Sequence, residues 1–271
     1  MKVVSFNING IRARPHQLEE IVTRHSPDII GLQETKVEDA QFPIDHIRAL
    51  GYDAIYHGQK GHYGVALLYR GQLVTSQTGL PGDGEDSQRR LVSITLASSQ
   101  GNLTVYNGYF PQGESRDHPV KFPAKQAFYR DLTQHLRTCH SPTENLIIMG
   151  DMNVAPLDKD IGIGEDNRKR WLRTGKCCFL PEEREWLKEL SLWGLEDSYE
   201  QLHSESGEQR YTWFDYRSRG FEAEPKRGLR IDLILATPAL LSRMRGAGID
   251  QQIRAMEKPS DHCPIWLDAE L

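Results

Sequence analysis

Two oxygen-bearing side chains stand directly after a short apolar run in the segment 145–153, Asn-Leu-Ile-Ile-Met-Gly-Asp-Met-Asn. The run from Leu146 to Met149 is typical of a strand that is buried on both faces. Asp151 and Asn153 follow this run, and an extended segment would point them the same way. A buried strand that presents a carboxylate and an amide at the edge of a core is a sound platform for catalysis. The pattern is equally typical of an Asx turn that closes a strand, so this segment alone leaves both interpretations open.

Three further polar residues share this position at the end of a predicted strand. Strands predicted over 2–8, 29–33 and 103–109 end at or next to Asn7, Glu34 and Tyr109. Any one such residue can follow a strand by chance. If the strand ends meet at one edge of the sheets, however, these side chains and those of Asp151 and Asn153 form a single site.

Asp232 differs because it lies inside the apolar run 229–235. Alternation along a strand places it on the face opposite the neighbouring aliphatic residues. A buried carboxylate is costly unless it is paired or hydrogen-bonded. Arg227 or Arg230 could supply the partner, and His262 is the alternative. An Asp–His pair would fix the tautomer of the ring and favour its protonated form.

The candidate metal ligands are all oxygen donors. Glu34, Asp151 and Asp261, together with Asn7, match the preference of Mg²⁺ and Mn²⁺ for oxygen. We see no clustered cysteines or paired histidines, which argues against structural zinc. With Asp232, four acidic groups at one edge would repel an anionic substrate unless a cation intervened. A phosphate ester with bound Mg²⁺ resolves that conflict.

The composition is that of a soluble globular protein. The chain has 271 residues, 38% of them hydrophobic and 26% charged, and no window approaches the roughly 20 apolar residues of a membrane span. The first residues are already strand-like, so we expect no signal or transit peptide and a cytoplasmic location. The net charge of −5 implies that any nucleic-acid binding must use a local basic patch. We expect the four cysteines to be reduced thiols without a metal role.

The periodicity alternates between helix and strand along the chain. It predicts helices over 16–25, 44–50 and 121–139 and one beginning at Pro181, with strands over 52–56, 65–70, 90–96, 229–236 and 264–271 in addition to those above. The segment between Pro156 and Gly194 is an excursion between core strands. We find no linker or low-complexity segment, so we expect two sheets with helices outside, in one domain spanning 1–271.

Several motifs resemble those of exonuclease III-type apurinic/apyrimidinic (AP) endonucleases, within the wider endonuclease/exonuclease/phosphatase superfamily. They are Ser5-Phe-Asn-Ile-Asn-Gly10, Leu32-Gln-Glu-Thr-Lys36, Asn107-Gly-Tyr-Phe-Pro111, Gly150-Asp-Met-Asn153, Tyr211-Thr-Trp-Phe-Asp215, Leu229-Arg-Ile-Asp232 and Ser260-Asp-His262. The segments 57–64 and 113–119 resemble the bacterial branch of this family. The resemblance covers almost the whole chain.

The resemblance implies a four-layered α/β sandwich, with two mixed β-sheets packed face to face and helices outside. It also implies dependence on Mg²⁺, for which Mn²⁺ would substitute. The expected substrate is double-stranded DNA with abasic sites or 3′ ends. The expected reactions are phosphodiester hydrolysis 5′ to abasic sites, 3′-to-5′ exonuclease activity and 3′-phosphatase or phosphodiesterase activity. We expect a monomer that does not bind membranes.

The resemblance also assigns roles to individual residues. It implies a metal site at Asn7, Glu34, Asp151, Asn153 and Asp261, and a catalytic set of Tyr109, Asp151, Asn153, Asp232 and His262. His262 and Tyr109 match groups that contact the scissile phosphate. Asp151, oriented by Asn153, is our choice for the base that activates water. The Asp232–His262 pair remains an alternative base.

The same resemblance points to DNA-contacting residues. Trp213 matches the aromatic wall of a pocket for an extruded abasic sugar, with Leu229 and Ile231 on its other side. Without the family, a core tryptophan would be the better interpretation. The cations of the segment 168–176 are either a solvated helix face or a patch that contacts DNA, for which we select Lys169 and Arg170, extended by Arg90 and Arg116. A sister enzyme acting on inositol phosphates or sphingomyelin, and a non-catalytic binding module, are the rival functions.

Overall fold

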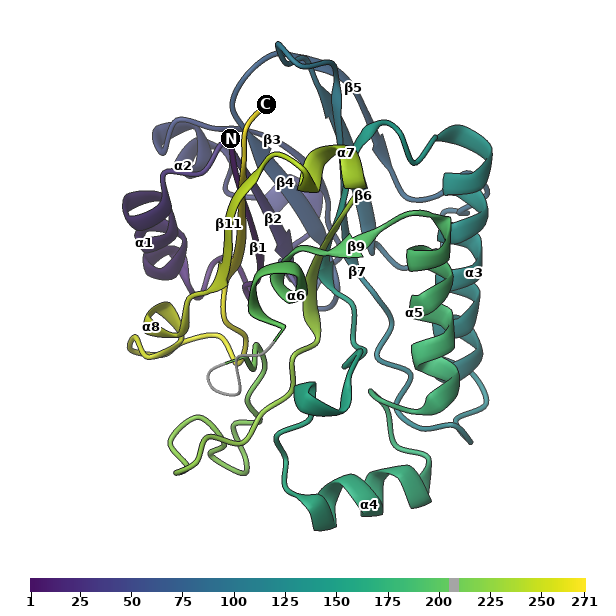
Figure 1. The fold of residues 1–271 in the computed structure, drawn as a ribbon. Coiled ribbons are helices and arrows are strands. Elements are labelled where there is room, and N and C mark those ends of the chain that lie inside the picture. Colours follow the sequence, from purple (N-terminus) through teal and green to yellow (C-terminus); the bar gives the residue numbers. More distant parts are fainter. Residues whose placement is uncertain (205–209) are drawn as a thin grey trace.

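The computed structural model describes residues 1–204 and 210–271, which form two six-stranded β-sheets packed face to face (Figure 1). The strands of the first sheet, in spatial order, are β11 (Met244–Ile249), β12 (Ile265–Ala269), β1 (Lys2–Asn7), β2 (Ile29–Gln33), β4 (Val65–Tyr69) and β3 (Asp53–His57). Those of the second sheet are β5 (Leu73–Thr78), β6 (Leu91–Leu96), β7 (Leu103–Tyr109), β8 (Asn145–Asp151), β10 (Asp232–Ala236) and β9 (Glu196–Asp197).

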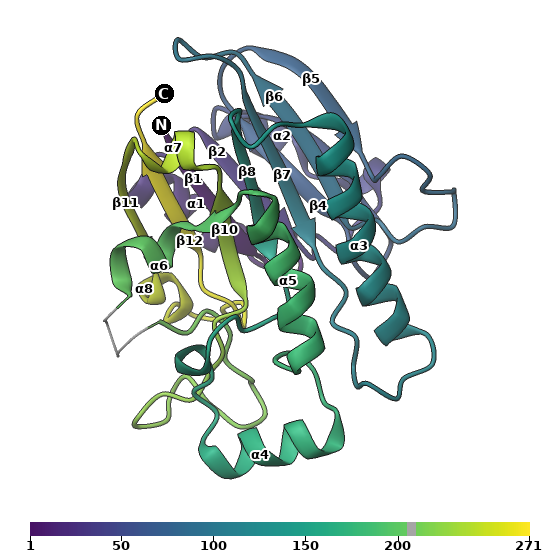
Figure 2. The same ribbon diagram turned by 45° about the vertical axis from the view of Figure 1, so that its right-hand side comes forward.

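Helices cover the outer face of each sheet. The first sheet is covered by α1 (Pro15–His25), α2 (Ile44–Ala49) and α8 (Gln251–Arg254), and the second by the neighbouring helices α3 (Lys121–Cys139) and α5 (Pro181–Trp193), as Figure 2 shows. The remaining helices are α4 (Glu165–Thr174), α6 (Ser198–His203), α7 (Pro238–Leu241) and the short 3-10 turns η1 (Asp39–Gln41) and η2 (Asp158–Asp160). The predicted architecture of two mixed sheets with helices outside is therefore confirmed.

Side-chain alternation along the central strands builds three apolar layers. In β8, Ile147 and Met149 belong to the cluster between the sheets, whereas Leu146 and Ile148 pack under α3 and α5. All four are fully buried, as the predicted two-faced strand requires. Burial of side chains of this size contributes about 1.5–3 kcal/mol each relative to exposure. The strands are consequently a rigid support for whatever stands at their ends.

The register of the second sheet aligns three polar residues in one row. Tyr109 at the end of β7 pairs with Asp151 at the end of the parallel strand β8, and Asp232 at the start of antiparallel β10 pairs with the same Asp151. Gly150 precedes Asp151 with φ +146°, and a Cβ there would lie 1.9 Å from the carbonyl oxygen of Gly108. Only glycine fits this close approach of the two strands.

Several predicted elements needed correction. The strand predicted over 229–236 begins at Asp232, because Leu229 exchanges backbone hydrogen bonds with Trp213 instead of with β8. The last strand ends two residues early, at Ala269. The sequence pattern did not predict β5, whose last four residues are polar and which is largely exposed at a sheet edge, or β11, which contains Gly246 and Gly248. Within the described parts of the chain, none of the helices combines the length and apolar character needed to cross a membrane.

Candidate active site

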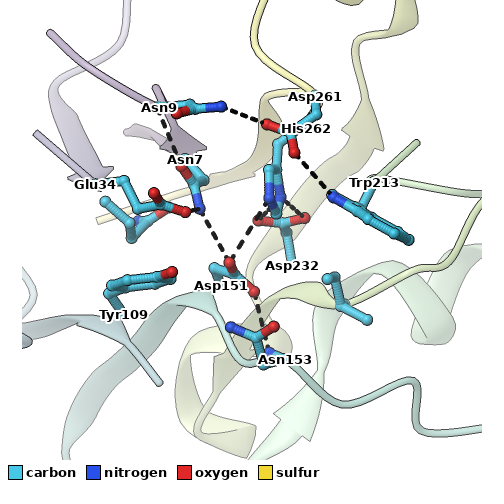
Figure 3. A network of polar contacts seen from close by, with 12 residues as sticks. Asn7, Asn9, Glu34, Tyr109, Asp151, Asn153, Trp213, Asp232, Asp261 and His262 are labelled. Atoms are coloured by element: carbon cyan, nitrogen blue, oxygen red, sulfur yellow. Dashed lines mark hydrogen bonds and ion pairs between the residues drawn. The ribbon is translucent and has the colours of Figure 1, made fainter. Parts of the chain in front are cut away.

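The strand ends meet, and one amide links the two sheets where they do (Figure 3). Asn7, the last residue of β1, donates through Nδ2 to Glu34 Oε1 at 3.0 Å and to Asp151 Oδ2 at 3.0 Å. Asn7 and Asp151 are buried, and Glu34 is partly exposed. The structure therefore brings Asn7, Glu34, Tyr109 and Asp151 together at one edge, as the sequence predicted.

Three residues around this edge have left-handed backbone conformations. The φ angles are 49° at Asn9, 52° at Glu34 and 52° at Asn153. Asparagine tolerates this region better than most residues, whereas for glutamate it is uncommon. Such strained positions persist where the surroundings over-determine them, which is frequent at functional sites. Here the three side chains are held by hydrogen bonds, Asn9 with Asp261, Glu34 with Asn7, and Asn153 with the carbonyl of Phe110.

Asp232 pairs with His262, and not with an arginine. His262 Nδ1 lies 3.1 Å and 2.9 Å from the two carboxylate oxygens of Asp232, and its Nε2 lies 3.7 Å from Asp151 Oδ2. Arg230, the alternative partner, turns away to Asp160 and Asp197. The hypothesis of an Asp–His pair is therefore supported by the geometry. The ring nitrogen that faces the cavity is Nε2.

The charges in this cluster shift two pKa values. Burial would lower the pKa of His262, but the charges of Asp232 and then Asp151 outweigh it and raise that pKa to about 10. Burial is also the largest influence on Asp151, and it raises the carboxyl pKa to about 7, with Asp232 and Glu34 adding to the effect against the opposing charge of His262. His262 is thus a cation at neutral pH, and Asp151 is poised to exchange a proton near pH 7.

The donor set fits a hard divalent cation. Among the described residues, Glu34, Asp151 and His262 each place a possible ligand atom within 4.8 Å of the others. Protonated His262 is no ligand, which leaves the two carboxylates as the charged donors. Glu34 Oε2 also lies 2.9 Å from Lys36 Nζ. Two carboxylates that converge in a partly buried place are the donors that Mg²⁺ and Mn²⁺ prefer.

Asp261 and Asn153, also predicted as ligands, have other contacts. Asp261 accepts hydrogen bonds from Asn9 Nδ2 at 2.9 Å and Trp213 Nε1 at 3.0 Å, and lies outside the group of three described above. The backbone N–H of Asn153 donates to Asp151 Oδ1 at 3.0 Å, and its side-chain Nδ2 donates to the carbonyl of Phe110 at 3.0 Å. Asn153 thereby fixes the orientation of the Asp151 carboxylate.

Tyr109 forms the floor of the site beside Glu34. Burial, with the charges of Glu34 and Asp151, holds the pKa of its phenol well above the usual value of 10. The ring contacts Arg90, whose guanidinium carbon lies 4.8 Å from the centroid of Tyr109 and 4.2 Å from that of Tyr63. Arg90 is 8% exposed and donates to the Tyr109 carbonyl. It supports Tyr109 and is not part of an open basic patch.

A cavity of about 360 Å³ opens over these groups. Trp213, Leu229 and Ile231 line it, as predicted, together with Asp151 and His262. Asp232 does not line the cavity and lies behind His262. The sequence analysis did not single out several other lining residues: Gln112, Trp171, Cys178, Asp215 and Arg217. Gln112 follows directly on a quoted motif and Asp215 ends another, so both carried a signal.

Two of the predicted basic residues lie on α4, at the bottom of the view in Figure 1, and the same helix contributes Trp171 to the lining of the cavity. Lys169 and Arg170 are exposed on α4, with Lys169 3.5 Å from Glu165 and Arg170 hydrogen-bonded to Asn167. Arg116 is in a two-point ion pair with Glu182. The acids of the first turn of α4 therefore offset part of the positive charge that follows them.

A buried ion pair supports the loop that carries Asn153. Lys125 Nζ, on α3, lies 2.5 Å from Glu183 Oε1 and donates to the carbonyl oxygens of Asn153 at 2.8 Å and Gln112 at 3.3 Å. Both side chains of the pair are fully buried. One ammonium group thus ties together two loops that line the cavity.

Replacing Lys125 by methionine should lower the free energy of unfolding by about 3–5 kcal/mol, because Glu183 is left as an unpaired buried charge. Urea unfolding followed by circular dichroism measures the change. The double variant Lys125→Met with Glu183→Gln is the matched control and should recover much of the loss. A single variant as stable as the unchanged protein would contradict this role of the pair.

The family model described as the endonuclease/exonuclease/phosphatase family matches residues 4–262. Exodeoxyribonuclease III of Haemophilus influenzae is 56% identical over 268 residues, covering 99% of each chain, and the DNA repair nuclease APEX1 of Danio rerio is 28% identical, covering 98% of this chain and 81% of that protein.

Solved structures agree with these matches. A 3′ phosphatase, NExo from Neisseria bound to a product DNA hairpin, superposes with a TM-score of 0.89 at 34% identity, covering 100% of both chains. An AP endonuclease from Archaeoglobus fulgidus gives a TM-score of 0.90 at 31% identity, again over 100% of both chains. The two-sheet architecture is the fold of these proteins.

Proposed function

We propose, from the premise that this chain belongs to the endonuclease/exonuclease/phosphatase family, that a DNA phosphodiester is hydrolysed in the cavity between Trp213 and the Asp151–His262 cluster. The enzyme is a DNA-repair nuclease of the exonuclease III and AP endonuclease type. It cleaves 5′ to abasic sites and has 3′-to-5′ exonuclease and 3′-phosphatase or phosphodiesterase activity. The observation that carries the proposed site is the convergence of one imidazole and two carboxylates beside an aromatic wall.

We place the metal at Glu34 and Asp151, with Asn7, Asn153 and Asp261 as the neighbours that orient the site. Mg²⁺ is our choice and Mn²⁺ its substitute, because both prefer oxygen donors. When bound, the ion supplies positive charge that offsets the charge developing on the phosphate. The crowding of Glu34 and Asp151, which helps to raise the pKa of Asp151, supports a cation between them.

We assign Asp151 as the general base because its neighbour His262 is already charged. His262 has a pKa of about 10 and is already protonated at neutral pH, so it has no free nitrogen lone pair with which to accept a proton. Asp151, with a pKa near 7, can take a proton from the attacking water. Asn153 holds one Asp151 oxygen and Asn7 the other, which keeps the carboxylate aimed at the cavity.

Two donors then face the phosphate. His262 presents Nε2–H, and Asp232 at its Nδ1 keeps the ring charged and oriented. Tyr109 remains a neutral phenol because of its raised pKa and can donate its O–H. Donors fixed in advance stabilise the charge that develops in the transition state without reorganisation. Asp232 is a positioning residue, since its carboxylate contacts the Nδ1 atom of His262 and does not line the cavity.

The apolar side of the cavity suits a sugar without a base. Trp213, Leu229 and Ile231 offer rings and aliphatic surface, and the 360 Å³ volume is open to one side. A normal nucleotide is still stacked and carries a base, so flipping it out costs more than flipping an abasic residue. One site can perform all three reactions, because each is an attack by water on a phosphorus bonded to a deoxyribose oxygen.

We place Lys169, Arg170 and Arg116 at the DNA backbone, since a chain with a net charge of −5 needs a local basic surface. Double-stranded DNA is the partner, and we propose a monomer that acts in the cytoplasm as one catalytic domain spanning 1–271. Arg90 belongs with Tyr109 and acts on the substrate through it.

Neutralising Lys169 and Arg170 together with glutamine should reduce the slope of log binding constant against log salt by about 2, since each lost phosphate contact contributes roughly 0.9. Fluorescence anisotropy with an abasic duplex at several salt concentrations measures the slope. Lys188→Gln, on the exposed face of α5, is the control and should leave the slope unchanged. An unchanged slope in the double variant would remove these residues from the interface.

The substrate class is tested by assaying DNA and the substrates of the rival functions in parallel. With Mg²⁺, the enzyme should incise a duplex containing one abasic-site analogue and release neither phosphate from an inositol polyphosphate nor phosphocholine from sphingomyelin. Release of phosphate or phosphocholine without incision would favour the sister enzymes. Duplex binding without any hydrolysis would favour a binding module.

A further inference from the structure

A second cluster of polar side chains lies at the far end of α3. The hydroxyl oxygen of Tyr106, on β7, is 2.9 Å from His135 Nε2 and 2.8 Å from His140 Nε2. Tyr106 is 3% exposed, and the two histidines stand at the last turn of α3 and immediately after it. His135 follows Lys125 by ten residues, which corresponds to about 15 Å along a helix, so this cluster is separate from the candidate active site.

The outer nitrogens of both imidazoles have partners of their own. His140 Nδ1 lies 2.8 Å from Glu144 Oε2, and His135 Nδ1 lies 3.6 Å from the Sγ atom of Cys139. A carboxylate on Nδ1 retains the proton there and leaves Nε2 with its lone pair directed inward. This is the arrangement that typically orients a metal-bound histidine.

The donor set differs from that of the acidic site. Burial and the neighbouring His140 lower the pKa of His135. Two imidazole nitrogens beside a phenol oxygen suit Zn²⁺ and related transition metals, and not Mg²⁺. The side chain of His140 is 14% exposed, which gives an ion a path to the cluster.

We propose that Tyr106, His135 and His140 form a binding site for a divalent transition-metal ion such as Zn²⁺. Its ligands are the two Nε2 atoms and the Tyr106 oxygen, and Glu144 orients His140. Ligand atoms around a tetrahedral zinc ion lie roughly 3.3 Å apart, given bonds of about 2.0 Å. The observed separations of 2.8 and 2.9 Å therefore need only a small outward movement of the rings. Burial raises the pKa of the Tyr106 phenol, so the bound ion would have to displace the phenolic proton, which leaves to solvent past the partly exposed His140.

The test is equilibrium dialysis with Zn²⁺ in the presence of excess Mg²⁺, which occupies the acidic site. The unchanged protein should retain one equivalent of Zn²⁺, and His135→Gln and His140→Gln should each lose it. Glu144→Gln should weaken binding by about 10–100-fold. His46→Gln, a partly exposed histidine on α2, is the control and should bind as the unchanged protein does.

Two further measurements distinguish loss of the metal site from loss of the fold. Co²⁺ in place of Zn²⁺ should give the visible absorption of a tetrahedral site, and Tyr106→Phe should alter it. Circular dichroism and nuclease activity should be unchanged in the histidine variants without Zn²⁺. The proposal is overturned if no equivalent is retained, if both histidine variants still retain it, or if Glu34→Gln abolishes it while His140→Gln does not. Tyr106 would then be a phenol hydrogen-bonded to two imidazoles.

Discussion

Replacing Asp151 by asparagine should reduce the turnover number for incision at an abasic site by about 10³-fold or more, with little loss of DNA binding. A general base contributes about 10²–10⁴-fold, and Asp151 is in addition one of the two carboxylates proposed to hold the metal. Asparagine retains the size of the side chain and can still accept the hydrogen bond from Asn7. It cannot accept a proton from water. Single-turnover cleavage of an end-labelled abasic duplex measures the change.

Stability separates lost chemistry from lost structure in this variant. Burial, the largest influence, raises the pKa of Asp151 from 3.8 to about 7. An acid whose pKa is higher in the folded state makes the folded protein less stable when it ionises, so removing this charge should offset much of the cost of the lost hydrogen bond from Asn153 N–H, and the melting temperature should change little. Asp166→Asn, on the exposed face of α4, is the control and should retain full turnover. A fall of less than tenfold in the Asp151 variant would reject it as the base.

Replacing Asp232 by asparagine should lower the pKa of His262 and reduce turnover by roughly 10²–10⁴-fold. Burial lowers the pKa of this histidine, and the charge of Asp232 is the largest influence that raises it to about 10. Without that charge the ring loses its proton at a lower pH and no longer donates from Nε2 as a cation. An asparagine partner can also stabilise the wrong tautomer of the ring, an effect of about 10⁴ in the serine-protease triad. Nitrogen-15 NMR of the histidine side chains measures the titration directly.

The same pair makes a prediction about stability and pH. The folded pKa of His262 is above its unfolded value of 6.5, so its contribution to stability is full below about pH 6.5 and is lost as the pH rises towards 10. The Asp232 variant should lose less stability over this range. The charge-retaining variant Asp232→Glu is the control. An unchanged His262 titration in Asp232→Asn would show that the pair does not set the charge of the ring.

The sequence was sufficient for the frame of the site because its residues stand at the ends of strands with clear patterns. The end of β8, and with it Asp151, could be placed from one apolar run and a glycine. The pairing of Asp232 with His262 was one of several options, and the structure decides it because Arg230 is already engaged by Asp160. The local sequence pattern around Asp232 could not show that its partner is His262, thirty residues further along the chain.

Other features depend on contacts that leave no local pattern. The hydrogen bond from Lys125 to the Asn153 carbonyl joins α3 to a segment beyond β8. The residues around Lys125 in the sequence do not predict that its charge is buried. The sequence reading also found no paired histidines, although His135 and His140 converge on Tyr106. Tyr106 lies about thirty residues earlier in an apolar strand, so the cluster exists only after β7 and α3 have packed.

Cleavage of two labelled duplexes, each with Mg²⁺ and with a chelator, tests the central claim most directly. One duplex carries a single abasic-site analogue and the other is intact with a recessed 3′ end. We predict incision 5′ to the lesion and shortening of the recessed strand, both with Mg²⁺ and neither with the chelator. Cleavage that persists in the chelator, or no cleavage of either duplex with Mg²⁺, would contradict a metal-dependent phosphodiesterase site at Glu34, Asp151 and His262.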